Sequence, residues 1–189
     1  MTKDEVIKIF QKAGALLEGH FILRSGLHSS RFFQAALILQ YPDIAEKLCS
    51  ELAANFKGMG VQTVISPAVG GLIVGQEVAR ALGVKAIFAD KENDQLVLKR
   101  GFTIEKGEKV LVAEDVITRG GRIIQTIELA RSFGAEVVGV AVIADRSSGN
   151  ATVDVPLKSM IELELPTYQP DDCPLCKQGI PLVKPGSKS

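Results

Sequence analysis

The sequence lacks the features of secreted, membrane-bound or disulfide-stabilised proteins. It contains only three cysteines, which fits a reducing compartment better than a disulfide framework. No apolar stretch is long enough for a membrane-spanning helix, and residues 1–5 have no signal-peptide pattern. We therefore expect a cytoplasmic protein that does not interact with membranes.

An excess of charge is also absent. The 22 basic side chains of Lys and Arg balance the 22 acidic side chains of Asp and Glu, so no broad electrostatic field is available to bind nucleic acid. Apolar residues make up 46% of the chain and charged residues 23%, as in an ordinary globular protein. A length of 189 residues suits a single domain with a sizeable core.

Two familiar phosphate-binding motifs, G-x-x-x-x-G-K and G-x-G-x-x-G, are missing, but residues 110–121 offer another candidate. Residues 110–113 form a continuous apolar run, as expected for a buried parallel strand. Glu114 and Asp115 follow where we expect that strand to end, and a glycine turn leads into a segment with helical spacing of apolar residues. The carboxyl end of a strand that feeds a helix N-terminus favours a phosphate-bearing ligand.

The two adjacent carboxylates indicate what the phosphate is attached to. Each carboxylate can accept charge-assisted hydrogen bonds from ribose hydroxyls, so the acids and the turn would together hold a ribose 5-phosphate. The alternative is an ordinary strand-to-helix turn with solvated acids, and these residues alone do not decide between the two.

Hydrophobic periodicity and turn residues predict an α/β fold in which strands alternate with helices. Short connections between them indicate a mostly parallel, doubly wound sheet with helices on both faces. We expect helices at 2–12, 42–56, 71–82 and 120–133, strands at 61–66, 84–89, 110–114, 135–145 and 160–165, short strands within 16–33, and a hairpin or lid at 91–101. Residues after 166 are expected to be loop-like, with a frayed tail at 184–189.

The run 110–121 resembles the signature of the type I phosphoribosyltransferases, which use phosphoribosyl pyrophosphate (PRPP). The resemblance implies the fold of that family with a small N-terminal hood. It also implies that Glu114 and Asp115 hold the ribose 2- and 3-hydroxyls. The matching 5-phosphate loop is Val116, Ile117, Thr118, Arg119, Gly120, Gly121 and Arg122. The last loop positions usually carry a small hydroxyl residue, so side-chain contacts at Gly121 are not assumed.

Residues 19–33, 66–72 and 144–149 resemble the hood, the pyrophosphate-side loop and a base-binding strand end of the family members that use orotate. The implied reaction transfers the 5-phosphoribosyl group from PRPP to orotate, giving orotidine 5-phosphate and pyrophosphate in de novo pyrimidine biosynthesis. The residues implied to contact orotate are Arg146, on its carboxylate, together with Phe32, Phe33 and Thr118. Those implied on the PRPP side are Arg24 and, through backbone N–H groups, Gly70 and Gly71, which stand where many relatives have a lysine.

The same resemblance implies Mg²⁺, held mainly by PRPP, and a homodimer with shared active sites. Lys91 and Asp115 are the catalytic candidates, and Lys91 matches the first lysine of a flexible loop that is partly donated by the other subunit. The second lysine and the histidine of that loop are absent here. Lys99 and Arg100 are candidate replacements, and the alternative is that they are ordinary cations at the end of a hairpin.

Two competing functions remain open. A phosphoribosyltransferase for purines would need a hydroxyl or amide acceptor where this chain has Arg146. A regulator that senses PRPP and binds nucleic acid would need an added basic domain, but only Lys3, Lys8 and Lys12 precede Arg24 as cations.

The cysteines are not assigned to the reaction. Cys49 has helical apolar neighbours and is expected in the core. Cys173 and Cys176 form a C-x-x-C pair, but a zinc site needs four ligands, and the two histidines, His20 and His28, lie far away in the sequence. We therefore predict no metal site formed by protein ligands; zinc shared across a dimer and a redox pair are the alternatives.

The resulting domain plan is one phosphoribosyltransferase domain over residues 1–189. It consists of a hood at about 14–36, a core at about 42–165 and a C-terminal extension at about 166–189. His28 is expected to be a polar surface residue. The extension is expected to be packed by its own apolar side chains, which are Pro174, Leu175, Ile180 and Leu182.

Overall fold

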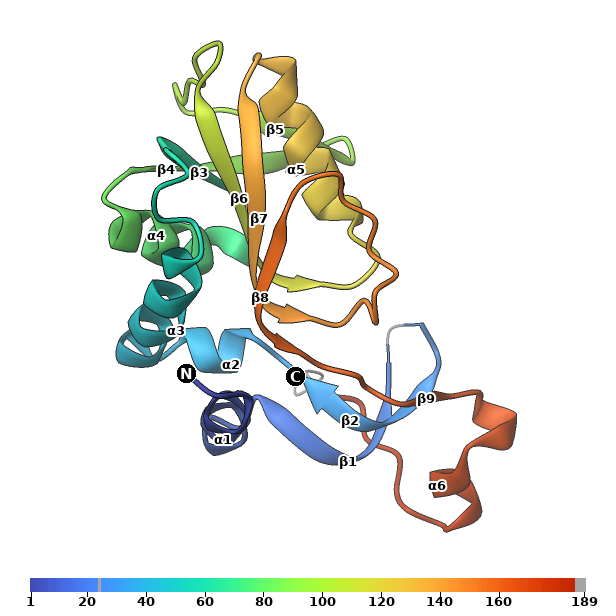
Figure 1. Ribbon diagram of the computed structural model, residues 1–189. Coiled ribbons are helices and arrows are strands. Elements are labelled where there is room, and N and C mark those ends of the chain that lie inside the picture. The colour runs from blue at the N-terminus through green and yellow to red at the C-terminus, as the bar shows by residue number, and fades with distance from the viewer. Residues whose placement is uncertain (24, 186–189) are drawn as a thin grey trace.

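The computed structural model describes residues 1–23 and 25–185 (Figure 1). Its larger sheet has six strands in the order β5-β4-β3-β6-β7-β8, and its smaller sheet has three in the order β1-β2-β9. The strands are β1 (Leu16–Ile22), β2 (His28–Phe33), β3 (Thr63–Pro67), β4 (Lys85–Glu92), β5 (Gln95–Leu98), β6 (Lys109–Ile117), β7 (Glu136–Asp145), β8 (Leu157–Glu162) and β9 (Thr167–Tyr168). The helices are α1 (Lys3–Lys12), α2 (Ala36–Leu39), α3 (Pro42–Ala54), α4 (Gly71–Leu82), α5 (Gly121–Ser132) and α6 (Pro174–Lys177), with a short 3₁₀ turn at Pro170–Asp172.

The large sheet is parallel except for its edge strand β5, which pairs antiparallel with β4. Helices α3 and α4 cover one face and α5 covers the other (Figure 1). The predicted doubly wound α/β sheet is therefore confirmed. No helix among the described residues is long and apolar enough to cross a membrane.

Strand β6 shows why helices are needed on both faces. Its side chains alternate, so that Val110 and Val112 pack in the cluster under α5, whereas Leu111 and Ala113 pack in the cluster under α3 and α4. Because both faces of this strand are buried, apolar residues do not alternate with polar ones along it. This explains the continuous apolar run in the sequence.

The two central strands, β3 and β6, create the crevice in which the candidate site lies. They are adjacent and parallel, but the helices that follow them, α4 and α5, lie on opposite faces of the sheet. The connections after β3 and β6 must therefore diverge. Ligands of open α/β sheets bind at such a switch point, beyond the carboxyl ends of the strands.

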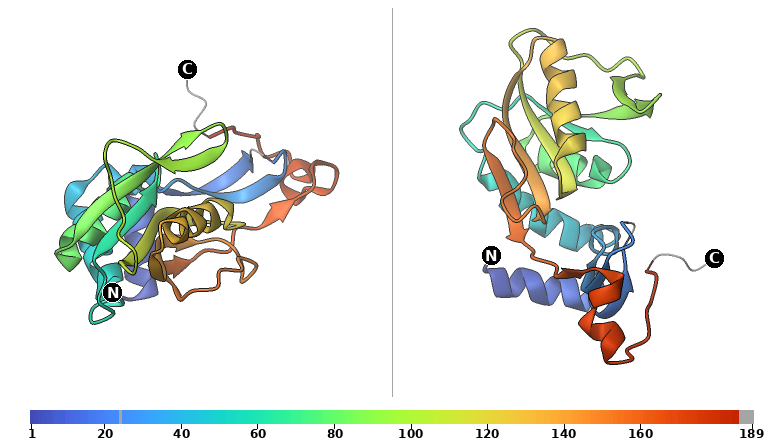
Figure 2. Two further views of the ribbon diagram at one scale, coloured as in Figure 1. Left: turned by 90° about the horizontal axis from the view of Figure 1, so that it is seen from above. Right: turned by 90° about the vertical axis from the view of Figure 1, so that its right-hand side faces the viewer.

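The small sheet lies beyond this same carboxyl edge of the large one, as Figures 1 and 2 show. Strands β1 and β2 form an antiparallel hairpin, and β9 adds to the outer side of β2. The predicted hood is therefore present, and it includes a strand from the C-terminal part of the chain.

Several predicted boundaries are wrong. Strand β6 extends to Ile117 because it stays paired with β7 up to the Ile117–Asp145 pair, so Glu114 and Asp115 lie inside the strand instead of at its end. Strand β8 lies at 157–162 instead of 160–165. The region after residue 166 contains β9 and α6 and is not simply loop.

Candidate active site

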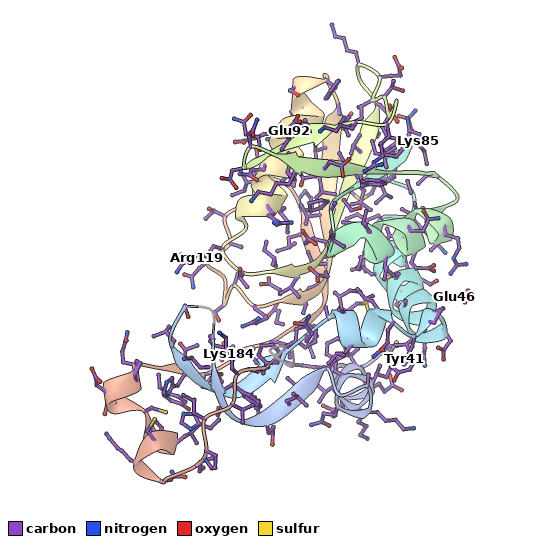
Figure 3. The ribbon with its side chains drawn as sticks, turned by 180° about the vertical axis from the view of Figure 1, so that it is seen from behind. Tyr41, Glu46, Lys85, Glu92, Arg119 and Lys184 are labelled. Atoms are coloured by element: carbon purple, nitrogen blue, oxygen red, sulfur yellow. The ribbon has the colours of Figure 1, made fainter. Side chains whose placement is uncertain are left out.

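A cavity of about 360 Å³ opens at the switch point. It is lined by Gly70, Glu114, Asp115, Val116, Ile117, Thr118, Gly120, Gly121, Arg122 and Ile123. The structure thus brings the paired acids, most of the predicted phosphate loop and one glycine of the 66–72 turn into one space. The exception within the loop is Arg119, whose exposed side chain lies on the outer side of the loop (Figure 3).

The turn after β3 approaches the paired acids closely, and the glycines of the turn permit this approach. A Cβ on Gly70 would lie 3.0 Å from Asp115 Oδ2, and a Cβ on Gly71 would lie 3.0 Å from Glu114 Oε1 and 2.9 Å from the Ala113 carbonyl oxygen. The peptide bond between Ala68 and Val69 in this turn is cis.

Glu114 is buried, and its partners are few. Burial, and secondly the neighbouring Asp115 carboxylate, raise the pKa of Glu114 to about 8. The Asp115 N–H donates to Glu114 Oε1 at 3.1 Å, and the Val116 N–H donates to Asp115 Oδ1 at 2.7 Å. These backbone donors orient the pair but leave carboxylate oxygens available to hydroxyl donors of a ligand.

The predicted phosphate loop leads directly into the N-terminus of α5. Gly120 caps α5 in the left-handed conformation with φ of 79°, which glycine adopts without strain. The first N–H groups of the helix have no partner within it and can bind an anion. The Arg122 guanidinium, from the first turn, donates to the Ala68 carbonyl at 2.8 Å and so ties the phosphate loop to the turn after β3.

Arg146 lies beside the end of β6, because its backbone N–H donates to the Ile117 carbonyl at 2.9 Å. Its Nε is buried and has no hydrogen-bond partner among the described residues. Burial also lowers the pKa of its guanidinium. A buried donor without a partner costs free energy, and an anionic ligand would satisfy it.

The two predicted base-covering aromatics differ in position. Phe33 is buried in the core and stacks on Phe10 with ring centroids 5.1 Å apart. Phe32 is half-buried, and its side chain lies on the other face of β2 from Phe33. Its ring contacts the ring of Phe21 from β1. Successive side chains of a strand point to opposite faces, so the structure favours core packing for Phe33 and leaves Phe32 as the candidate for a base contact. Arg24 lies outside the described residues.

The predicted hairpin at 91–101 is present as β4 and β5, but it stands apart from the cavity within one chain. Lys91 is exposed and pairs with Asp94, Lys99 pairs with Glu92, and Arg100 pairs with Asp90 and lies over the Phe88 ring. Figure 3 shows Glu92, at the end of this hairpin, well separated from Arg119. These contacts favour the ordinary role of Lys99 and Arg100 as hairpin cations.

Four residues that the sequence analysis left unconnected come together elsewhere. His20 and His28 lie next to Cys173 and Cys176, with ligand atoms all within 4.8 Å of one another. The prediction that His28 is a surface residue is wrong, because only 6% of it is exposed. Sequence distance concealed this cluster, and the C-x-x-C pair was the one visible signal. Cys49, by contrast, is in the core as predicted.

Comparison with known proteins shows the family to which the chain belongs. The family model described as "Phosphoribosyl transferase domain" matches residues 38–175. The chain belongs to the phosphoribosyltransferase family. Among curated relatives, a protein of Pelotomaculum thermopropionicum named orotate phosphoribosyltransferase is 55% identical over 188 residues, covering 100% of this chain and 99% of the relative. A protein of Desulforamulus reducens with the same name is 53% identical, covering 100% and 98%.

A solved structure supports the fold of this phosphoribosyltransferase. The crystal structure of orotate phosphoribosyltransferase from Aeropyrum pernix superposes with a TM-score of 0.69 at 29% identity. The superposition covers 84% of this chain and 93% of that one. The type I phosphoribosyltransferase fold is therefore confirmed.

The raised pKa of Glu114 predicts a pH dependence of stability in the ligand-free protein. The folded state holds a proton up to about pH 8 that the unfolded state, with a pKa of 4.5, releases. This contribution is fully present below pH 4.5 and is lost as the pH rises to about 8. We expect Tm to fall over that interval, and Glu114→Gln to remove part of the fall and to be more stable than the parent protein in alkaline solution.

Glu108→Gln is the matched control for these melting curves. Burial disfavours the charge of Glu108, but hydrogen bonds from Thr63, the Glu105 N–H and Lys85 outweigh burial and lower its pKa. Glu108 stays charged above pH 5, so its replacement should destabilise the protein without flattening the curve. An unchanged curve in Glu114→Gln would show that Glu114 is ionised in the folded protein.

Proposed function

We propose that this chain is an orotate phosphoribosyltransferase, which transfers the phosphoribosyl group from PRPP to orotate and releases pyrophosphate. One observation carries the proposal: an acid pair, a glycine turn and a helix N-terminus line a single cavity at the switch point. These three features suit a ribose, a pyrophosphate and a 5-phosphate. The relatives that match the chain end to end carry the same name.

In this reaction Glu114 and Asp115 accept hydrogen bonds from the ribose hydroxyls. A bond forms between an orotate ring nitrogen and the anomeric carbon as the bond from that carbon to pyrophosphate breaks. Positive charge develops on the ribose ring during this exchange, so the protein holds and orients both reactants and does not supply a nucleophile. The negative charge of Asp115 then favours the transition state as well as ribose binding.

Mg²⁺ fits this site through PRPP. The cavity offers carboxylate oxygens, which are the protein ligands that Mg²⁺ prefers, and it offers few of them, as expected for an ion that is held mainly by phosphates and water. The ion would neutralise charge on the departing pyrophosphate. Glu114 and Asp115 are the residues that would lie nearest to it.

Arg146 recognises the orotate carboxylate. Its buried Nε lacks a partner among the described residues, and a guanidinium binds a carboxylate in a two-point contact. Thr118 lines the cavity and would contact the base as well as the phosphate. Phe32, from the hood, would cover the base. A purine has no carboxylate, so Arg146 disfavours the purine reaction.

The active form is a homodimer in which Lys91 acts on the partner's site. Lys91 does not line the cavity of its own chain, and it sits on an exposed hairpin. The apolar side chains of Val69 and Ile73, next to the cavity, are 77% and 45% exposed, which suits a surface covered by a second copy. We expect this dimer to work in the cytoplasm.

The proposed reaction is tested by following the ultraviolet absorbance of orotate after addition of PRPP and Mg²⁺. We expect loss of the orotate signal that needs the metal, and no turnover of hypoxanthine or uracil. Binding of PRPP without turnover of any base would contradict the proposal and would identify the protein as a PRPP sensor.

Arg146→Ala should raise the KM for orotate at least about tenfold more than the KM for PRPP, because a charge-assisted hydrogen bond contributes about 1.5–3 kcal/mol. Initial rates with each substrate varied in turn measure the two constants. Arg131→Ala is the control. Arg131 lies near the C-terminal end of α5, is exposed and pairs with Asp154, so its replacement should change neither constant. Equal changes in both constants for Arg146→Ala would refute its assignment.

Mixing Lys91→Ala subunits with Asp115→Asn subunits tests action across the dimer. Each preparation alone should be nearly inactive. An equal mixture should recover about a quarter of the parent activity, because half of the dimers are hybrids and each hybrid has one intact site. Differently tagged subunits verify that hybrids form, and hybrids without recovered activity would place Lys91 in its own chain's site or outside catalysis.

A further inference from the structure

His20, His28, Cys173 and Cys176 form a compact cluster on the hood, remote from the catalytic cavity. His20 lies in β1, and His28 is the first residue of β2. Cys173 precedes α6, and Cys176 lies within it. Segments about 150 residues apart in the chain thus meet here, as the position of α6 beside β1 and β2 in Figures 1 and 2 illustrates.

Four of the six distances between ligand atoms of the cluster are close to those of a tetrahedral metal site, and all six are within 4.8 Å. His20 Nε2 lies 3.0 Å from His28 Nδ1, 3.4 Å from Cys173 Sγ and 3.7 Å from Cys176 Sγ, and Cys176 Sγ lies 3.4 Å from His28 Nδ1. Four ligands around one zinc ion would be about 3.3 Å apart for two nitrogens and about 3.5 Å apart for nitrogen and sulfur, given Zn–N and Zn–S bonds of about 2.0 and 2.3 Å. Each of these four distances agrees with the expected value to within about 0.3 Å.

The ring of His20 is held in the orientation that a metal ligand needs. Its Nδ1 lies 2.7 Å from the Ile180 carbonyl oxygen, and because a carbonyl only accepts, Nδ1 carries the proton in the neutral ring. The lone pair of Nε2 therefore points at the two sulfurs and at His28. A backbone carbonyl on the far nitrogen is the usual support of a metal-bound histidine.

The cluster also includes the one buried residue of the described C-terminal extension, Cys173, whereas Cys176 is exposed. Within residues 166–185, Cys173 alone is buried, at 0% exposed. The predicted packing by Ile180 and Leu182 is wrong, because both side chains are exposed. An extension with so little apolar burial gains little stability from the hydrophobic effect, so other interactions must hold it.

Backbone hydrogen bonds show how the extension wraps around the hood. It enters as β9 beside β2, passes through α6, and returns to the other edge of the small sheet. There the Val183 N–H donates to the His20 carbonyl at 2.8 Å, and the Ile22 N–H donates to the Val183 carbonyl at 3.0 Å. The four-residue cluster lies along the extension between these two backbone pairings, which are β9 with β2 and Val183 with β1.

We propose that His20, His28, Cys173 and Cys176 bind one structural zinc ion that fastens the C-terminal extension to the hood. Two thiolates and two imidazoles in tetrahedral geometry select Zn²⁺ over hard cations such as Mg²⁺. All four protein ligands are present, so no position is left for catalysis. Three of the four ligands lie outside the residues that match the family model, which end at 175, so this site is an addition to the phosphoribosyltransferase domain.

The zinc content of the purified dimeric protein, produced without a polyhistidine tag, tests the proposal. Elemental analysis should find about one zinc ion per chain. The double variant Cys173→Ser/Cys176→Ser and the single variant His20→Gln should lose most of it. Cys49→Ala is the matched control, because it removes a buried thiol from α3, outside the cluster, and should retain the zinc of the parent protein.

Experiments on the unmutated protein keep the test independent of how the variants fold. A strong chelator should lower Tm and expose the peptide bond after Lys177 to trypsin, and added zinc should reverse both effects. Cobalt(II) added to the chelated protein should give the visible absorption of a tetrahedral thiolate complex. The catalytic cavity contains no thiol, so this absorption reports on the cluster and not on Mg²⁺ bound with PRPP.

Three results would overturn the proposal. The first is protein without zinc that also fails to bind added zinc or cobalt. The second is zinc that persists in the double cysteine variant. The third is metal-free protein, purified without reductant, whose intact mass shows a disulfide between Cys173 and Cys176, because the pair would then be a redox pair.

Discussion

The close approach of two turns at the ends of β3 and β6 is the constraint on which the rest of the site depends. The strands are neighbours, but their helices leave on opposite faces, so the turns must pass within van der Waals contact of the acids. Gly70 and Gly71 permit this contact, since a Cβ at either position would meet a carboxylate oxygen at 3.0 Å. A Cβ at Gly71 would also meet the Ala113 carbonyl oxygen at 2.9 Å, so a larger residue there would require the backbone to shift.

The same geometry leaves a polar cavity that the free protein does not satisfy. Glu114 is buried next to Asp115, and burial followed by the charge of Asp115 raises its pKa to about 8. Beside the end of β6, Arg146 keeps a buried Nε without a partner among the described residues. A ligand with hydroxyl groups at one end and a carboxylate nearby would complement both groups. These two groups therefore lower the stability of the ligand-free protein, but they are already in position when substrates bind.

The hood and the C-terminal extension form a second structural unit that depends on different interactions. The large sheet is stabilised by apolar side chains on both of its faces. The extension has almost none of these, and it relies on strand pairing with β1 and β2 and on the cluster of His20, His28, Cys173 and Cys176. The hood, with which the extension pairs, lies beyond the carboxyl edge of the large sheet (Figure 1).

The sequence by itself determined the α/β fold and singled out the run of residues that lines the main cavity. Apolar periodicity is a local property, and it located α4 and α5 to within about one residue. The order of Glu114, Asp115 and the glycine turn is equally local, and apart from Arg119 the grouping of these residues around one cavity was predicted. The length of β6 was not, because its last residues are held in the strand by pairing with β7, which is a contact between distant segments.

Tertiary structure decided what depends on contacts between residues far apart in the chain. It assigned Phe33 to the core through its stacking on Phe10, and it left Lys91 away from the cavity of its own chain. It also assembled the histidine and cysteine cluster, whose members are up to 156 residues apart. The sequence spacing of ligands indicates a metal site only when they lie on one local segment. Here two lie on the first hairpin and two on the extension, and only the wrapping of the extension around the hood brings them within bonding distance of one ion.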